Sequence, residues 1–458
     1  MGTVAAPRLP IASDRSGSGA AGIGQLAGFD DRPVAWFHGA VTAADAPVMT
    51  RAIRAGIDNG IPVVGVVDRA GLEPDAGLAA LSGLGMVARE LAAASGVVPT
   101  ALVLDGPCLG APAVAAGLVD LVVMTDQATM FVNGPAATAR MTGIQGLDPQ
   151  QLGGPWAHSS RSGVADAVAT DVTESLEVVG DVLSFLPANS LEVPPTMTSA
   201  DPPDRGCGNL AVVVPSNDRS SYDVRDVIAE VADDHWFVEL RASYGASLVV
   251  GFARIAGLPV GVVANQPSQL AGALDIESSL KGARFVRWCD SFNLPLLTLV
   301  DTPGFRPGRD QEWRGIVRHG AKLAFAYAEA TVPRVSVVLR KAYGGAYIVM
   351  DCKSMGNDCA LAWATAEIAV MGAKGAVEIV HRKALQRIED AGEREARRVQ
   401  LEADYSTEHL SPRVAAERGY IDGVIDPAAT RLAVAEALMA LSAKREKPVR
   451  RRHENIPL

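Results

Sequence analysis

The sequence predicts an α/β protein with mostly parallel sheets flanked by helices, built from one unit that occurs twice. From Arg32 onward, short apolar runs typical of strands alternate with amphipathic helical runs, which is the pattern of parallel βαβ crossovers. Each half contains a proline-led apolar strand that ends in an aspartate, at residues 62–68 and 295–301. A glycine loop follows each strand at nearly equal spacing, around Gly110 and around Gly345. We therefore expect two related halves that each supply backbone N–H groups to one active site.

The amino half is expected to form a first domain over residues 31–190. The preceding residues 1–30 open with a Gly-, Ala- and Ser-rich stretch, and we expect them to be disordered or peripheral. Apolar runs and the helical spacing of apolar residues predict strands at 34–37, 63–67, 101–104 and 121–124, and helices at 46–59 and 78–94.

The carboxyl half restarts the same pattern after a linker. A stretch rich in Pro, Ser and Thr indicates that linker, which we place at residues 191–220, before a second domain at residues 221–445. The expected elements of the second domain are strands at 248–252, 260–264, 296–300 and 335–339, and helices at 224–232, 277–293 and 316–330.

Three further segments of the carboxyl half have distinctive compositions. Residues 247–264 form the longest apolar stretch, but they include Arg254, Gly257 and Pro259, which favour two strands joined by a turn over a membrane span. Residues 389–402 are dense in charge and predict an exposed helix or helical arm stabilised by local Glu/Arg pairs. The more apolar helix expected at residues 428–441 needs a surface to cover it. Because it lies outside the second repeat, we expect a subunit interface there.

Composition excludes several classes of function. The chain has 458 residues, of which 48% are hydrophobic, so it can form substantial cores, and its net charge of −10 argues against nucleic acid as a partner. A basic tail at residues 446–458 is expected to be solvated. Five scattered cysteines without a C-x-x-C pair argue against structural zinc, a disulfide framework or any bound metal: Cys108, Cys207, Cys289, Cys352 and Cys359. The absence of a visible signal peptide in the first 21 residues favours a cytoplasmic location.

The repeated glycine loops indicate the chemistry. A strand that ends in Gly344-Gly345-Ala346 and then opens a helix directs free backbone N–H groups at a ligand, and such groups stabilise an oxyanion. A Gly-Gly pair after a strand more often serves tight packing, but its repetition in both halves favours catalysis. Two oxyanion holes suit a reaction in which one molecule becomes an enolate while the other also develops negative charge on oxygen.

Longer stretches of the carboxyl half resemble the carboxyltransferase (β) subunit of biotin-dependent acyl-CoA carboxylases, the acetyl-/propionyl-CoA carboxylase β chain family. The stretches that carry this resemblance are residues 300–312, 316–322, 326–333, 340–347 and 369–378, together with 265–267 and 283–290. In the amino half, Gly153-Gly154-Pro155, His158 and Ser162-Gly163-Val164 belong to the same pattern. The resemblance implies two tandem crotonase-like (ClpP/crotonase) domains. It also implies active sites at a dimer interface, where the amino-terminal domain of one subunit faces the carboxyl-terminal domain of another, usually within a homohexamer built as a trimer of dimers.

The resemblance further implies the reaction and its partners. Carboxybiotin on a separate carrier protein, supplied by a biotin carboxylase (α) subunit, releases CO2. Biotin then helps to remove the α-proton of a short acyl-CoA, and the resulting enolate attacks CO2 to give malonyl- or methylmalonyl-CoA. No nucleophilic side chain is required. This chain has neither a biotinylation Met-Lys signature nor a G-x-x-x-x-G-K-[ST] loop, so the carrier and the ATP site are expected on other proteins, with no role for nucleic acid or membrane.

Matching the family motifs assigns candidate site residues. The biotin-side oxyanion hole matches Gly345 and Ala346, and the thioester-side hole matches Gly110 and Ala111. The expected substrate-binding residues are Gly344, Tyr347, Ile348, Gly372, Ala373 and Gly134. Ile348 stands where relatives vary with acyl length, and an apolar residue there resembles members that accept acetyl-CoA as well as propionyl-CoA.

The amino half departs from the family in three places. Residues 69–73 replace the usual Ser-Gly-Gly-Ala-Arg, so that Glu73 exchanges a cation for an anion, and Pro112 replaces an alanine and has no N–H. A Gly-Gly segment expected between Ala40 and Pro47 is missing. All three changes fall on the acyl-CoA side. They leave two alternatives to a carboxylase open: a decarboxylase of a malonyl- or polyketide-type acid, or a non-catalytic structural subunit in a mixed oligomer with a paralogous β subunit.

Several reactive residues have simpler explanations. His319 is expected to be structural rather than a proton shuttle, and Asp301 and Glu312 are expected to cap or pair. Cys108 adjoins the amino-side loop, but no histidine is near it in sequence, so a buried small hydrophobe is favoured over a nucleophile.

Overall fold

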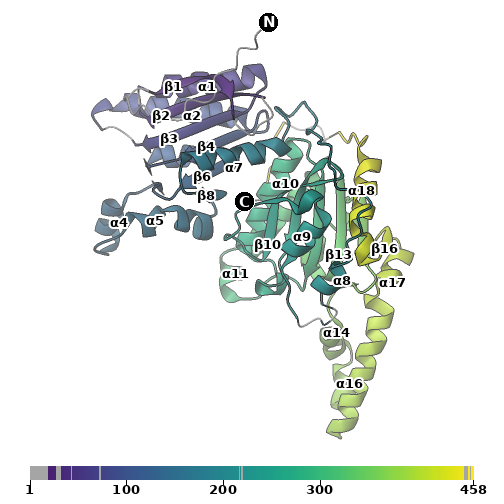
Figure 1. Cartoon of the computed structure of the whole chain (residues 1–458). Coiled ribbons are helices and arrows are strands. Elements are labelled where there is room, and N and C mark those ends of the chain that lie inside the picture. Colours follow the sequence, from purple (N-terminus) through teal and green to yellow (C-terminus); the bar gives the residue numbers. More distant parts are fainter. Residues whose placement is uncertain are drawn as a thin grey trace. The chain divides into compact units, whose positions relative to one another are not determined.

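A computed structural model describes residues 19–26, 32–42, 44–71, 74–215, 217, 220–447, 452, 453 and 455–457. The chain forms two compact units. The amino-terminal unit comprises residues 1–195 together with 240–244 and 291–293, and the carboxyl-terminal unit comprises the remainder. Each unit contains one large sheet flanked by helices (Figure 1). No helix in the described ranges is long and apolar enough to cross a bilayer.

The amino-terminal sheet is parallel except at its first pair of strands. Its order is β1-β2-β3-β4-β6-β8, with β1 antiparallel to β2, while the short strands β5 and β7 lie off this path. Its strands are β1 Ala20–Gln25, β2 Pro33–Val41, β3 Val63–Ala70, β4 Thr100–Leu104, β5 Pro107–Leu109, β6 Leu121–Thr125, β7 Thr129–Phe131 and β8 Ala167–Ala169. The central strands are rich in valine and leucine and are buried, as expected for parallel strands covered on both faces.

Helices flank this sheet, and one apolar core joins it to the helices at residues 46–59, 78–94 and 111–116. Helix α1 (Ala46–Asn59) has a proline in its first turn and ends at Gly60, whose φ of 63° is left-handed. Gly56 lets α1 approach β3 closely, because an added Cβ would lie 2.3 Å from the Val63 side chain. The other helical elements are η1 Pro74–Ala76, α2 Leu78–Ala94, α3 Ala111–Ala116, α4 Pro135–Thr142, α5 Pro149–Gly153, α6 Pro155–Ala157, the π-helical turn η2 His158–Ser162 and α7 Val172–Phe185.

The carboxyl-terminal sheet repeats this plan. Its order is β16-β14-β13-β12-β11-β10-β9, and β15 pairs with the end of β13. The strands from β11 to β16 are parallel along this order, whereas β10 and β11 form an antiparallel hairpin that turns at Ala256 and Gly257, confirming the expected two-strand reading of residues 247–264. The strands are β9 Phe237–Leu240, β10 Leu248–Ile255, β11 Leu258–Asn265, β12 Leu296–Thr302, β13 Arg334–Tyr343, β14 Cys359–Trp363, β15 Glu367–Ala369 and β16 Gly423–Ile425.

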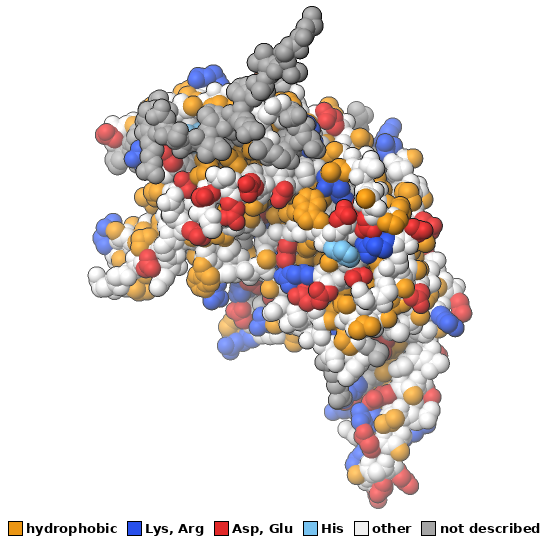
Figure 2. Space-filling model, viewed as in Figure 1, with side chains coloured by type: hydrophobic (Ala, Val, Ile, Leu, Met, Phe, Trp, Pro, Cys, Tyr) orange, Lys and Arg blue, Asp and Glu red, His pale blue; other side chains and the backbone are white. Residues whose placement is uncertain are grey.

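The helices of this unit match the expected ones closely where apolar spacing is regular. They are α8 Leu210–Val213, α9 Val224–Val231, η3 Asp233–His235, η4 Leu270–Gly272, α10 Ile276–Ser291, α11 Arg309–Trp313, α12 Ile316–Glu329, α13 Gly344–Val349, η5 Lys353–Met355, α14 Ala373–Val380, α15 Arg382–Gln386, α16 Ala391–Tyr405, η6 Ser406–Leu410, α17 Pro412–Glu417, η7 Pro427–Ala429 and α18 Thr430–Leu441. Helix α16 forms the expected arm (Figure 1), and Figure 2 shows positive and negative side chains mixed along it. Arg398 bonds Glu395 and Glu402 there, which is the local pairing that its charge pattern predicts.

The structure corrects the expectation for the last helix. Helix α18 buries Val434, Ala435 and Leu438 in the core of its own unit, so the chain itself supplies the surface that covers its apolar face. Its apolar composition is therefore explained without a subunit interface.

The expected segment boundaries also differ from the structure. Residues 20–25 of the segment expected to be disordered or peripheral form the edge strand β1, whereas residues 1–18 and 27–31 lie outside the described residues. Much of the expected linker at residues 191–220 belongs to the carboxyl-terminal unit, where Cys207 and Leu210 enter the core. Of the basic tail at residues 446–458, residues 448–451, 454 and 458 lie outside the described residues.

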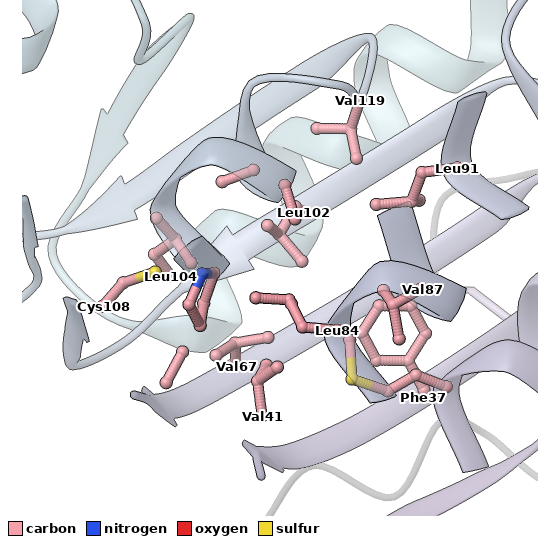
Figure 3. Close-up of a pocket in the computed structure, with 15 residues that line it drawn as sticks. Phe37, Val41, Val67, Leu84, Val87, Leu91, Leu102, Leu104, Cys108 and Val119 are labelled. Carbon is pink, nitrogen blue, oxygen red and sulfur yellow. The ribbon is translucent and has the colours of Figure 1, made fainter. Parts of the chain in front are cut away.

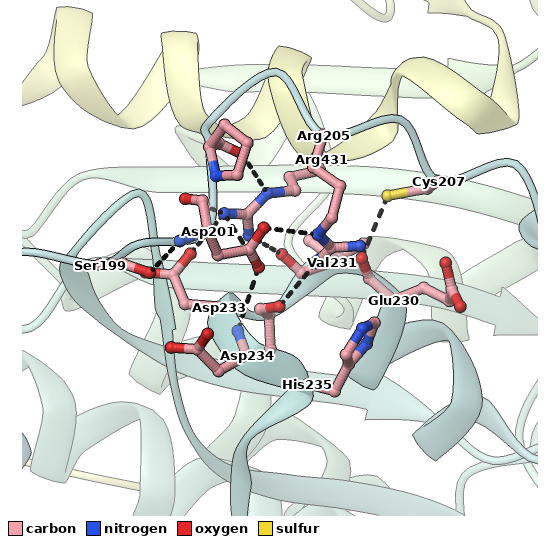
Figure 4. A network of polar contacts seen from close by, with 12 residues as sticks. Ser199, Asp201, Arg205, Cys207, Glu230, Val231, Asp233, Asp234, His235 and Arg431 are labelled. Carbon is pink, nitrogen blue, oxygen red and sulfur yellow. Dashed lines mark hydrogen bonds and ion pairs between the residues drawn. The ribbon is translucent and has the colours of Figure 1, made fainter.

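A buried ionic network explains why the expected linker is ordered (Figure 4). The Arg431 side chain, at 0% exposure, lies 2.6 Å from the Asp233 carboxylate and donates to the Val231 carbonyl at 2.7 Å. Asp233 also accepts the N–H groups of Ala256 and Gly257 at the β10–β11 turn. Arg431 further donates to the carbonyls of Pro202 and Asp201. The Arg431 guanidinium, with Asp233, thus joins α18, the end of α9, the hairpin turn and the segment that was expected to be a linker.

We expect Arg431→Met to destabilise the carboxyl-terminal unit by about 3–5 kcal/mol, because it leaves the buried Asp233 carboxylate without its counter-charge. Urea unfolding followed by circular dichroism measures the loss. The matched control is Arg397→Met on the exposed surface of α16, which should change stability by no more than about 0.5 kcal/mol. Equal unfolding midpoints for the two variants would contradict the role assigned to Arg431.

Candidate active site

The two glycine loops occupy equivalent places in their units. Strand β5 pairs with β7 in the register Leu109↔Phe131, and the end of β13 pairs with β15 in the register Tyr343↔Ala369. The next residue in each copy, Gly110 or Gly344, has a positive φ (82° and 58°), which favours glycine. A short helix starts here in both copies: α3 begins one residue after Gly110, and α13 begins at Gly344 itself.

This geometry shifts the correspondence between the copies by one residue. The nearly equal spacing from the repeated aspartates predicts that Gly110 corresponds to Gly345. The backbone instead pairs Gly110 with Gly344, Ala111 with Gly345, and Pro112 with Ala346. The next glycines, Gly134 and Gly372, also correspond. Each caps the start of a helix, α4 or α14, with nearly the same extended backbone (φ −66° and ψ 165°; φ −65° and ψ 156°).

On the amino side, the loop presents few N–H groups. The Gly110 N–H donates to the Phe131 carbonyl at 2.8 Å, so it already has an acceptor. The Ala111 N–H opens α3, and among the described residues it has no hydrogen-bond partner. Pro112 has none to offer. At the corresponding position of the second copy, Ala346 retains its N–H, so the first copy has lost one donor.

The Pro112 ring itself faces the core rather than a ligand. It lines a cavity of about 20 Å³ together with Val67, Leu84, Leu104 and other apolar side chains (Figure 3). A volume this small and apolar is a packing gap and not a ligand site. The effect of Pro112 on the loop is therefore the missing N–H rather than an obstruction. The other diverged residue, Glu73, lies outside the described residues.

On the carboxyl side, the loop opens onto a much larger cavity of about 600 Å³. The first N–H groups of a helix have no intrahelical acceptor, so those of Gly345 and Ala346 at the start of α13 are available. Gly344, Gly345, Tyr347 and Ile348 line the cavity, together with Cys352, Lys353, Ser354, Ile368, Ala369, Val370, Tyr405, His409, Val414, Ala415, Arg418 and Tyr420. Burial raises the pKa of the Tyr347 hydroxyl, which therefore stays protonated at neutral pH.

Gly372 and Ala373 lie at the start of α14, next to the strand that carries this loop. A Cβ added to Gly372 would lie 3.3 Å from the Tyr343 ring, so glycine allows that ring to pack against the start of α14. The Tyr343 hydroxyl hydrogen-bonds the Glu367 carboxylate on β15. Tyr343 stands inside the repeated motif, but nothing in the sequence pattern points to Glu367 as its partner.

A buried aspartate fixes the strand that carries the carboxyl-side loop. Asp301, at 1% exposure, accepts hydrogen bonds from the Tyr222 hydroxyl (2.9 Å), Arg340 Nε (3.1 Å) and the Lys341 N–H (3.1 Å). The pairing of β12 with β13 shifts register at this point, between Val300 and Thr302. Burial raises the pKa of Asp301, while Arg340 opposes that shift. The expected pairing role of Asp301 is thus a clamp at the point where β13 begins to pair with β15.

The first copy holds the strand before its glycine loop by a different contact. Its equivalent aspartate, Asp68, is exposed, and Gly106 occupies the place of Arg340. A Cβ added to Gly106 would lie 1.9 Å from the Asp68 carbonyl oxygen, so only glycine permits this approach of two backbones. The first copy therefore uses a close backbone contact where the second uses a buried ion pair.

Two other expected residues can be placed. The pKa of His319 on α12 is lowered by burial and by nearby Lys322 and Arg318, so its ring is neutral at pH 7. The Cys108 thiol is buried, and burial raises its pKa to about 12. Within the described ranges no group of three or more His, Cys, Asp or Glu residues is arranged to hold a metal ion.

We expect Cys108 to resist thiol reagents in the folded protein, since at pH 8 a thiol with a pKa near 12 is almost entirely protonated and the side chain is also inaccessible. Alkylation with iodoacetamide followed by peptide mass spectrometry should label Cys108 only after denaturation. Rapid labelling of Cys108 in the native protein would revive the nucleophile hypothesis.

We expect Asp301→Asn to destabilise the protein by about 3 kcal/mol, because it leaves the nearly buried Arg340 without a counter-charge. Asp68→Asn is the control that the duplication itself supplies, and its effect should stay within about 0.5 kcal/mol, since Asp68 is exposed. Denaturant unfolding of both variants measures the difference. Equal losses would show that the repeated aspartates play the same part.

Comparison with known proteins gives a consistent family. The carboxyl transferase domain family matches residues 17–456. The propionyl-CoA carboxylase beta chain of Saccharopolyspora erythraea is 44% identical over 432 residues, which cover 92% of this chain and 79% of that protein. The methylmalonyl-CoA decarboxylase subunit alpha of Propionigenium modestum is 43% identical over 400 residues, covering 87% of this chain and 77% of that one.

A solved structure confirms the expected fold class. The crystal structure of transcarboxylase 12S, described as a hexamer with hydrolysed methylmalonyl-coenzyme A bound, superposes with a TM-score of 0.92 at 38% identity, covering 96% of this chain and 85% of that one. The match spans both units. The resemblance inferred from the glycine loops and the longer motifs is therefore confirmed, and the chain belongs to the carboxyl transferase family as an acyl-CoA carboxyltransferase subunit of the biotin-dependent carboxylase type.

Proposed function

We propose that this protein transfers a carboxyl group from carboxybiotin, held on a separate carrier protein, to the α-carbon of acetyl- or propionyl-CoA. The products are malonyl- and methylmalonyl-CoA. One observation carries the proposal: the two strand-to-helix turns share a backbone geometry, and Gly345, at the start of the second helix, lines a cavity of about 600 Å³. The kinship with propionyl-CoA carboxylase beta chains supports it.

The carboxyl-side loop takes the biotin in this proposal. The N–H groups of Gly345 and Ala346 hold the ureido oxygen of biotin as it gains negative charge, and preorganised donors of this kind favour the charged state over the neutral one. Gly344, Tyr347 and Ile348 form the wall beside them. Gly372 and Ala373 fix the start of α14 behind this wall. When bound, carboxybiotin supplies both the CO2 and the base for the α-proton.

The amino-side loop takes the thioester oxygen. Ala111 is the principal donor, because the Gly110 N–H already has the Phe131 carbonyl and Pro112 has no N–H. Gly134, at the start of α4, holds the far side of this loop, since a Cβ there would lie 3.2 Å from Leu109. A weaker hole stabilises the enolate less, so we propose slower turnover than in relatives that retain the second donor.

The apolar side chain of Ile348 supports a short unbranched acyl group. It lines the cavity and its side chain is half-exposed, so no charge or hydrogen-bonding group meets an acyl chain at this position. A methyl or ethyl group fits such a surface without desolvating a polar partner.

A decarboxylase is the second candidate. Methylmalonyl-CoA decarboxylase subunits from two organisms match this chain at 43% and 40% identity. The same two loops would serve, because the enolate lies between the carboxylated and decarboxylated acyl-CoA in either direction. The missing donor at Pro112 bears on both directions alike.

The assembly proposed is a homohexamer that works with a biotin carboxylase and biotin-carrier (α) subunit. The hexameric transcarboxylase 12S supports the oligomer, and the beta-chain designation of relatives supports a separate α subunit. A mixed oligomer with a paralogous β subunit is the alternative assembly.

The deciding experiment combines the purified chain with biotin carboxylase, a biotinylated carrier, ATP and bicarbonate. Transfer of ¹⁴C to acetyl- or propionyl-CoA supports the carboxylase. Release of CO2 from methylmalonyl-CoA without ATP, in the absence of such transfer, supports the decarboxylase. Neither activity, together with co-assembly with an active β subunit, would leave a structural subunit.

We expect Ala346→Pro to lower kcat roughly 100-fold, corresponding to about 3 kcal/mol of lost transition-state stabilisation, because it removes one oxyanion donor. Proline is tolerated in the first turn of a helix, and Pro112 occupies the equivalent place in the first copy. The control is Ala346→Gly, which keeps the N–H and should retain kcat within a few-fold. A fully active Ala346→Pro variant would remove Ala346 from the biotin side.

A further inference from the structure

The amino-side loop depends on a three-residue strand with a single described neighbour. Strand β7 pairs with β5 and with no other described strand. The Thr129 N–H and the Phe131 carbonyl both point toward β5, where they bond Gly106 and Gly110. Backbone groups alternate sides along a strand, so the Met130 carbonyl between them points to the opposite edge.

A histidine covers that opposite edge. His158 Nε2 lies 2.8 Å from the Met130 carbonyl oxygen, and Nδ1 lies 2.7 Å from Ser162 Oγ. A carbonyl only accepts, so Nε2 carries the proton. Nδ1 of the neutral ring is then the acceptor, and the Ser162 hydroxyl donates to it.

Two local features bring His158 close to the edge of β7. A Cβ added to Gly153 would lie 2.2 Å from the Met130 carbonyl oxygen, so glycine lets the helical segment reach the strand edge. His158 and Ser162 are the first and last residues of the π-helical turn η2, which ends at Gly163 with a φ of 67°. Single π-turns are rare and concentrate at functional sites.

The strand edge is coupled directly to the loop. Cys108 pairs with Met130, Leu109 pairs with Phe131, and the Gly110 N–H bonds the Phe131 carbonyl. Among the described residues, β5 pairs with β3 of the main sheet through Ala70↔Cys108. Strand β7 therefore contributes directly to the position of Gly110, and through it of Ala111.

We propose that His158 is a positioning residue for the amino-side oxyanion loop and that Ser162 fixes its tautomer. The Ser162 hydroxyl selects the ring form that can donate from Nε2, His158 anchors the edge of β7, and β7 holds Gly110 and Ala111 in place. Only the catalytic part of this inference rests on the function proposed above, since the structural coupling is independent of the substrate.

Hydrogen–deuterium exchange of the full-length protein tests the coupling. In His158→Ala, peptides covering residues 106–113 and 128–133 should exchange at least several-fold faster than in wild type. His158→Gln should restore slow exchange, because its amide can donate to Met130 and accept from Ser162. His235→Ala is the matched control, since it also removes a ring-nitrogen contact to a backbone carbonyl, that of Ala229, but in the carboxyl-terminal unit. Unchanged exchange in His158→Ala, or equal acceleration throughout the amino-terminal unit, would overturn the proposal.

Kinetics test the catalytic consequence. His158→Ala should lower kcat for acyl-CoA carboxylation by roughly tenfold, less than loss of a direct donor. CO2 release from the carboxylated carrier without acyl-CoA should be unchanged, because it uses the other loop. Ser162→Ala should give a smaller loss of the same kind. If wild type is inactive, the function proposed above fails while the exchange experiment still decides the role of His158; if wild type is active and His158→Ala has full activity, the positioning role fails alone.

Discussion

The carboxyl-terminal unit depends on how one buried carboxylate is satisfied. Asp301 sits where β13 begins to pair with β15, and it is held by the Tyr222 hydroxyl, Arg340 and a backbone N–H. Because an unpaired charge there would be very costly, the strand ends can adopt only an arrangement that brings these donors together. Strand β13 leads directly into Gly344 and Gly345, which line the large cavity. Because Asp301 fixes the end of β13, the backbone of the loop that follows is held in place before a ligand binds.

The two copies show that one backbone geometry can rest on different supports. In the first copy the aspartate is exposed, a glycine replaces the arginine, and the backbone of Gly106 meets that of Asp68 directly. The histidine at the edge of β7 has no counterpart among the contacts described for β15, where Glu367 bonds Tyr343 instead. The shape of the turn was retained while its energetic basis changed. This explains why Pro112 fits the fold while altering the chemistry.

Much of the fold was predictable because its signals are local. Helices α1 and α2 lie where the spacing of apolar residues places them, and α1 also has a first-turn proline and a terminal glycine. The buried valine-rich strands match to within a few residues. The glycine loops were found for the same reason, since a positive φ requires a residue type visible in sequence.

What escaped prediction depends on contacts between residues far apart in the chain. The offset between Gly110 and Gly345 became visible only from strand pairing, since insertions between the copies hide it. The composition of the expected linker is typical of a flexible segment, yet Arg431 orders it from more than 200 residues away. Helix α18 was assigned to an interface because it lies outside the second repeat, whereas its core partners come from distant parts of the chain. The contact of His158 with Met130 could not be predicted either, because it is made to a backbone carbonyl, which every residue type has.

The Arg431 network has a consequence for synthesis on the ribosome. Asp233, the hairpin turn and most of the sheet emerge early, but the cation that neutralises Asp233 lies in the last helix. Until α18 leaves the exit tunnel, the carboxyl-terminal unit holds a carboxylate that it cannot bury, and so it cannot close its core. The unit therefore reaches its native state only after the ribosome has made Arg431, which follows Asp233 by 198 residues.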